Sequence, residues 1–127
     1  MSIYDVQSGE ALKGLKALDL GQSAVAQLML KYLGDHGATA ICIESRTHVD
    51  ITRSSSPYFG GVVNPNRAAN ACLTLTSRFG FGLNIRKPEG VEIARRLCAW
   101  ADVVISSYPR GVMERHGLGH EDLRKLN

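Results

Sequence analysis

The sequence predicts an α/β domain with a Rossmann-like open parallel sheet and flanking helices. Two short apolar runs, 39–44 (TAICIE) and 103–105 (VVI), are rich in β-branched residues, which is typical of strands buried on both faces. Each run follows a stretch of helical periodicity, and strand, helix, strand is the order of a βαβ unit. With 127 residues the chain can enclose a core, and we expect one domain over residues 1–127.

The first predicted βαβ unit begins with a strand at 15–20 (LKALDL) and ends with the strand at 39–44. The intervening helix repeats apolar residues at helical spacing, and we expect this face to cover the sheet. Its members are Val25, Leu28, Met29, Tyr32 and Leu33. Gly37 is placed to end the helix in the left-handed conformation, which glycine adopts at little cost.

The second predicted unit runs from a short strand at 83–85 through a helix to the strand at 103–105. Pro88 suits the first position of this helix, because the backbone N–H that proline lacks has no helical partner there. The apolar face comprises Val91, Ala94, Leu97, Cys98 and Ala101. A helical turn at 112–116 and a final helix at 120–126, with Leu123 and Leu126 facing inward, complete the pattern. Because no strand follows, we expect the chain to be an incomplete half of a larger fold.

Residues 45–79 form an irregular segment between the two units, since clusters of Ser, Gly, Asn and Pro interrupt any periodicity. A short helix is expected at 68–75, and 79–82 (FGFG) is expected to turn the chain into the next strand. A segment of this length without periodicity is usually functional or covered by another part of the protein.

Composition narrows the classes of function. Apolar residues make up 44% and charged residues 21%, as in globular proteins, and no apolar run is long enough to cross a membrane. The net charge is +3, with ten arginines and five lysines spread over loops and strand ends. This spread indicates a small phosphorylated ligand rather than nucleic acid. The first ten residues show no signal-peptide pattern, and the three widely spaced cysteines indicate a reduced, cytoplasmic setting.

Two common kinds of site are disfavoured. A dinucleotide-binding turn needs the glycines of G-x-G-x-x-G, whereas the turn after the first strand is GQSAVAQ, with a single glycine. Glu44 at the end of the second strand could otherwise have been a ribose ligand. His116 and His120 are four residues apart but are separated by Gly117 and Gly119, so they do not share a regular helix face. We therefore expect neither an NAD or FAD site nor a metal site.

Several motifs resemble the N-terminal part of the family III CoA-transferases, the CaiB/BaiF type. These motifs are GLKALDL, LGDHGATAICIE, DITR, LNIRKPEG, ADVVISSYPRGVMERHGLG and EDLRKLN, and they occur in the family's order over nearly the whole chain. The α-methylacyl-CoA racemases share the pattern. The resemblance implies CoA bound at the strand ends, acyl-CoA and a carboxylic acid as substrates, and an interlinked homodimer.

Catalysis in this family uses an aspartate that forms a mixed anhydride with the acyl group and then becomes a CoA thioester. That aspartate lies beyond the position that matches Asn127, as does the acid/base pair of the racemases. The parent protein is therefore expected to be an enzyme. We expect no catalytic residue in this chain, and the chain alone is expected to be inactive.

The resemblance also implies a set of CoA-binding residues, which would contact the phosphates and the adenine. Arg46 and Arg78 lie at or next to positions where the family has basic residues. Ser107 and Tyr108 match the family's asparagine-phenylalanine pair, and Arg115 matches its turn arginine.

The turn after the first strand departs from the family pattern, because Ala24 and residues 25–27 (VAQ) replace a glutamine and an alanine-glycine-proline sequence. Lys87 replaces the threonine that caps the next helix, which costs about 1 kcal/mol. These changes suggest weakened CoA binding. Two alternatives to a transferase domain therefore stay open: a degenerate, non-catalytic subunit that assembles with an active partner, and a fragment of a racemase-type isomerase.

Overall fold

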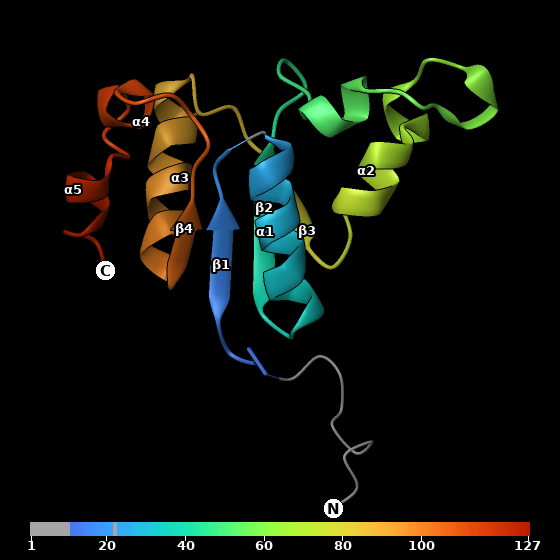
Figure 1. The fold of residues 1–127 in the computed structure, drawn as a ribbon. Helices are drawn as coiled ribbons and strands as arrows, with labels where there is room; N and C mark the ends of the chain where they lie inside the picture. Colours follow the sequence, from blue (N-terminus) through green and yellow to red (C-terminus); the bar gives the residue numbers. More distant parts are fainter. Residues whose placement is uncertain (1–10, 22) are drawn as a thin grey trace, which may run out of the picture.

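The computed structural model describes residues 11–21 and 23–127, so the first ten residues, for which the sequence predicts no signal peptide, lie outside the described part. The described residues form one parallel sheet in the order β3-β2-β1-β4, which confirms the predicted architecture (Figure 1). The strands are β1 (Lys16–Asp19), β2 (Thr39–Glu44), β3 (Phe79–Gly82) and β4 (Val103–Ile105). The chain moves outward from β1 to β3 and then returns to β4, so the strand order reverses between β1 and β4.

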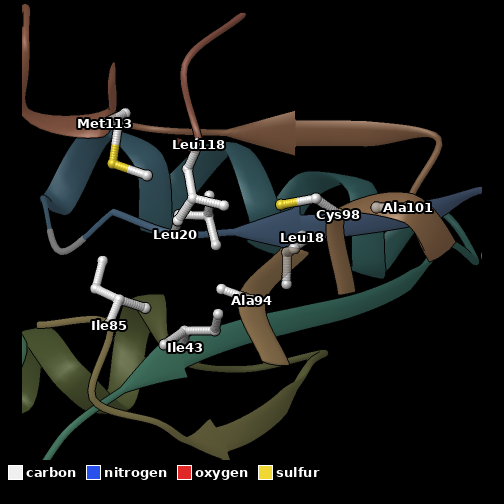
Figure 2. Packing of buried hydrophobic residues seen from close by; sticks show 9 residues of the cluster. All are labelled: Leu18, Leu20, Ile43, Ile85, Ala94, Cys98, Ala101, Met113 and Leu118. Carbon is white, nitrogen blue, oxygen red and sulfur yellow. The ribbon is translucent and has the colours of Figure 1, made fainter. Parts of the chain in front are cut away.

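The main apolar core lies between the sheet and α3 (Pro88–Trp100), with α4 (Val112–Arg115) and α5 (His120–Leu123) on the same side. Leu18 on β1 and Leu20, directly after the strand, alternate with Ala17 and Asp19, and the two leucines face this core. Figure 2 shows its buried members: Leu18, Leu20, Ile43, Ile85, Ala94, Cys98, Ala101, Met113 and Leu118. The predicted inward face of the second helix is confirmed, and Leu123 and Leu126 pack against the same cluster.

Helix α1 (Ala24–Asp35) covers the opposite face of the sheet, but with a different set of residues from the predicted one. Ala26, Gln27 and Leu30 are its buried residues, and they lie against small side chains of the strands, including Ala17 and Ala40. The predicted apolar face is wrong, because most of it points away from the sheet. Val25, Leu28, Met29 and Tyr32 are exposed, and Leu33 alone of the five packs against the core.

The third strand lies four residues earlier than the sequence predicted. Residues 79–82, expected as a turn, pair in parallel with β2, while Leu83 donates the last ladder bond to the Glu44 carbonyl at 3.0 Å. Asn84 then ends the strand, because its side-chain oxygen accepts the Arg86 N–H at 3.0 Å and its carbonyl accepts the Lys87 N–H at 3.2 Å. These bonds form a turn that leads into α3.

Each of the two long helices has a glycine at its closest approach to the chain that flanks β3. A Cβ atom on Gly34 of α1 would lie 1.9 Å from the Ser77 carbonyl oxygen, which precedes β3. A Cβ atom on Gly90 of α3 would lie 2.0 Å from the Asn84 carbonyl oxygen, which follows it. The edge strand is thus held at both ends by backbone-to-backbone contacts that only glycine permits.

The segment between β2 and β3 contains short helical turns: η1 (Ile51–Ser54), η2 (Phe59–Gly61) and η3 (Pro65–Arg67). Helix α2 (Ala69–Thr74) follows them and confirms the short helix predicted at 68–75. In Figure 1 this segment, coloured green to yellow, extends past the sheet on the side of β3. None of the helices in the described residues is long and apolar enough to cross a membrane.

Candidate functional site

Surface hollows follow one another along the carboxyl edge of the sheet. The outer groove, with a volume of about 940 Å³, lies at the ends of β2 and β3, and the inner cleft, of about 350 Å³, lies at the ends of β1 and β4. A small hollow of about 20 Å³ lies between them. It shares Ser45, Leu83 and Asn84 with the outer groove, and Leu20 and Tyr108 with the inner cleft. The arrangement can accommodate an extended ligand across the strand ends.

Three of the five sequence-predicted site residues lie along this edge. Arg46 lines the outer groove, and Tyr108 lines both the small hollow and the inner cleft. Ser107 lies against the turn after β1, since a Cβ atom on Gly21 would be 2.3 Å from its Oγ atom. The single glycine of that turn therefore lets the ends of β1 and β4 come together, which is where the strand order reverses. Burial raises the pKa of Tyr108, and the charge of Arg86 opposes this.

The other two predicted residues lie elsewhere. Arg115 is exposed on α4 and lines neither the outer groove, the small hollow nor the inner cleft. Arg78 points inward, and its buried Nη1 atom has no hydrogen-bond partner among the described residues. Burial lowers the pKa of Arg78, and the neighbouring acidic groups oppose this. The structure thus does not bring the five residues into one pocket.

Arg78 belongs to a buried polar cluster under α1, which sequence reasoning missed. Asp19 is fully buried, and its Oδ1 atom accepts the Gly21 N–H at 2.7 Å, while its Oδ2 atom has no partner among the described residues. Burial raises the pKa of Asp19 to about 7, which the Gly21 N–H and Arg78 partly oppose. Cys42, the neighbour of Asp19 on β2, has its pKa raised by burial to about 11, so its thiol stays protonated.

Gln27 extends this cluster towards η1. It is fully buried, and its Nε2 atom donates to Asp50 Oδ2 at 2.5 Å and lies 3.5 Å from Cys42 Sγ. The other oxygen of Asp50 accepts the Thr52 N–H at 2.7 Å and so caps η1. Helix α1 and η1 are therefore tied together by the side chain that stands where the family pattern has a proline.

Glu44 and Arg53 form an ion pair in the wall of the outer groove, which sequence reasoning also missed. Arg53 Nε lies 2.8 Å from Glu44 Oε1, and the same oxygen accepts the Asp50 N–H at 3.3 Å. The DITR motif contains Asp50 and Arg53, and an Asp two residues before a Thr could have predicted the capped turn. Its contact with Glu44 depends on chain packing that the motif does not encode.

No metal-binding group is evident in 11–21 and 23–127, where no three His, Cys, Asp or Glu side chains lie close enough together to hold an ion. The side chains that line this edge include the guanidinium groups of Arg46 and Arg53, the amides of Asn66 and Asn84 and the hydroxyl of Tyr108. A parallel α/β sheet whose hollows lie at the strand carboxyl ends defines the class of Rossmann-like ligand-binding domains.

The family model for CoA-transferase family III matches residues 12–127, and the chain belongs to this family. The resemblance stated from the motifs is thereby confirmed. Among curated relatives, the succinyl-CoA:glutarate CoA-transferase of Mus musculus is 32% identical over 123 residues, and the succinate–glutarate CoA-transferase of Agrobacterium fabrum is 30% identical over 118 residues. The alpha-methylacyl-CoA racemase of Homo sapiens is 29% identical over 122 residues.

A solved structure of a CaiB/BaiF family protein from Brucella suis superposes with a TM-score of 0.81 and 31% sequence identity. The match covers 94% of this chain but 31% of that one. The mouse and Agrobacterium relatives are likewise covered over 27% and 30% of their lengths, against 96% and 91% of this chain. The chain therefore spans less than a third of the relatives that it matches.

Proposed function

We propose that the chain is the CoA-binding N-terminal part of an enzyme that transfers CoA between carboxylic acids. The observation that carries this proposal is the run of hollows along the carboxyl edge of the sheet in a chain that belongs to CoA-transferase family III. An acyl-CoA is long and anionic at its nucleotide end, so it needs an extended site with cations at one end.

In this proposal the residues of the chain bind and orient the nucleotide end of the acyl-CoA. Arg46 contributes charge to the outer groove, Tyr108 offers an aromatic wall for the adenine, and Ser107 offers a hydroxyl beside the narrow turn at Gly21. Arg115 would reach the ligand from α4. Arg78 acts through the buried cluster. The carboxylate nucleophile is expected beyond Asn127, so we expect no transfer activity from these residues alone.

The relatives suggest the first substrates to test. The mouse and Agrobacterium relatives are named for succinyl-CoA, succinate and glutarate, so a dicarboxylic pair is the first choice. A racemase-type isomerase is the alternative that the human racemase supports. Its distinguishing result would be exchange of the α-proton of a 2-methylacyl-CoA with no acceptor acid.

Since the cysteines of the described residues are free thiols, we place the protein in a reducing compartment, the cytoplasm.

Calorimetric titration with CoA tests the proposal. The chain should give a saturable heat, and Arg46→Ala, which removes a guanidinium group from the outer groove, should raise the Kd about tenfold, the equivalent of about 1.4 kcal/mol. Arg96→Ala, which removes an exposed charge from the middle of α3, is the matched control and should bind as the wild type does. Absence of binding at millimolar CoA would contradict a CoA-binding role.

A second function, assembly with an active partner or a second copy, is favoured by the exposed apolar side chains. Apart from those on α1, these include Phe59 at 80%, Val63 at 79%, Leu73 at 66% and Phe79 at 67% exposure. Large apolar side chains that stay exposed are typical of surfaces that another chain covers. Light scattering after size exclusion should therefore show a dimer or higher species, whereas a monomer at high concentration would rule out self-assembly.

A further inference from the structure

Arg53 is fixed from two sides by contacts within the chain. Asp50 caps the η1 turn that carries Arg53, and the buried Gln27 holds Asp50 from α1. Glu44, at the end of β2, accepts both the Asp50 N–H and the Arg53 Nε–H. The turn and the guanidinium are therefore positioned by a strand and a helix of the sheet layer rather than by a free loop.

The contact with Glu44 uses only one edge of the guanidinium. Because Nε donates to Glu44, the end of the group that carries Nη1 and Nη2 remains for another acceptor, and neither atom has a hydrogen bond to any residue in the described ranges. The side chain is 28% exposed, so that end can be reached from the outer groove, which Arg53 lines. Two parallel N–H groups in a fixed plane match the oxygens of a phosphate.

The surroundings favour an anion over a neutral ligand. The charged residues that line the outer groove are Glu44, Arg46 and Arg53, which leaves one net positive charge after the ion pair is counted. Asn66 and Asn84 add amide groups to the same lining. Arg78, by contrast, does not line the groove, and its Nη1 atom is buried.

We propose that Arg53, held by Glu44, binds a phosphate group of the acyl-CoA in the outer groove. This inference rests on the proposed function and deepens it, because it assigns the phosphate contact to a residue that the family resemblance did not indicate. The phosphate can be the 3′-phosphate or the diphosphate of CoA, since both present the same oxygens. Glu44 acts as the positioning residue.

Binding constants for CoA and for 3′-dephospho-CoA test the assignment. Arg53→Gln should raise the Kd for CoA about tenfold. Arg67→Gln is the matched control: it removes a nearby exposed arginine on η3 that does not line the groove, and it should leave binding unchanged. Arg53→Lys keeps the charge but loses the planar fork, and it should fall between the two. Loss of affinity for CoA alone identifies the 3′-phosphate, and equal loss for both ligands identifies the diphosphate. Wild-type affinity in Arg53→Gln would overturn the proposal.

A second measurement separates this proposal from the proposed function. The Nε–H signal of Arg53, assigned by its absence in Arg53→Lys, should shift in NMR spectra when pyrophosphate is added. A shift without any binding of CoA would sustain the phosphate contact and refute the CoA-binding role. No shift at saturating pyrophosphate, in a protein that does bind CoA, would overturn the role of Arg53.

Discussion

Helices α1 and α3 have nearly the same length and cover opposite faces of one sheet, yet they use their apolar residues differently. On α3, Ala94 and Cys98 are buried in the main core. On α1, Val25 is 70%, Met29 52% and Tyr32 58% exposed. Helical periodicity shows that a helix has an apolar stripe, but it does not show which stripe meets the sheet. The outward stripe of α1 is a surface that the rest of a longer chain or a partner could cover.

The largest loss of stability should come from replacing the glycines of the two helices, Gly34 and Gly90. Because both lie equally close to a carbonyl oxygen, we expect equal losses. Gly34→Ala and Gly90→Ala each place a Cβ atom about 2 Å from a carbonyl oxygen, and each should lower the free energy of unfolding by about 4 kcal/mol or more. Urea denaturation measures this. Gly80→Ala meets open space and is the control, with a change within about 0.5 kcal/mol. Tolerance at one helix alone would show that the two contacts are not equivalent.

The second effect concerns pH, because among the described residues the buried carboxyl groups lie on the α1 side of the sheet. Since the pKa of Asp19 in the folded chain is raised to about 7, the folded state binds a proton more readily than the unfolded one. The contribution of Asp19 to stability is therefore fully present below pH 4 and is lost as the pH rises through 7, by up to about 4 kcal/mol at 1.4 kcal/mol per unit. Asp19→Asn should abolish this slope.

Stability curves between pH 4 and 8, compared with those of the wild type, give the measurement. Cys98→Ala on the α3 face is the control, since burial raises the pKa of that thiol to about 11 and it does not titrate in this range. A slope that persists in Asp19→Asn would mean that another group carries the pH dependence.

The third effect tests the orientation of α1 with two neighbouring residues. Leu30 is fully buried, so Leu30→Ala should cost about 3 kcal/mol, whereas Met29→Ala should change the stability of the chain by less than about 0.5 kcal/mol. Thermal unfolding of the two variants gives the answer. A larger loss of stability in Met29→Ala than in Leu30→Ala would mean that the face predicted from the sequence is the buried one.

The smallest effect concerns the first turns of the two helices. Ser23 caps α1 by accepting the Ala26 N–H at 3.3 Å, whereas Lys87 offers α3 no side-chain cap. Ser23→Ala should therefore lower the free energy of unfolding by about 1 kcal/mol, and Lys87→Ser should raise it by a similar amount. Chemical denaturation resolves both changes, and a stabilising Ser23→Ala would contradict this account of the caps.

Elements with a strong local signal were predictable from the sequence. The β-branched runs gave β2 and β4 with the bounds that the structure has, and Pro88 marked the start of α3. Strand β3 was not predictable, because its alternating Phe and Gly residues are typical of turns. In the structure these residues pair with β2, and the turn follows them at Asn84.

The candidate site was predictable only in outline. A parallel sheet places ligands at its carboxyl edge, so the positions of Arg46 and Tyr108 follow from topology. The inward direction of Arg78 and the pairing of Arg53 with Glu44 depend on contacts between segments far apart in the chain. Composition and spacing carry no record of such contacts, so neither the burial of the Arg78 Nη1 atom nor the Arg53–Glu44 ion pair could be predicted.

Among residues 11–21 and 23–127, strand β3 has no neighbour on its outer side, so one row of its backbone N–H and C=O groups is not paired within the sheet. The bare backbones at Gly34 and Gly90 let the two long helices contact the chain on either side of this strand, next to the turn at Asn84 that ends it. Any added bulk there would release a flat, glycine-rich edge that another molecule can extend by pairing, the usual first step of fibrous aggregation. The two glycines thus help to keep this edge strand in its place in the sheet.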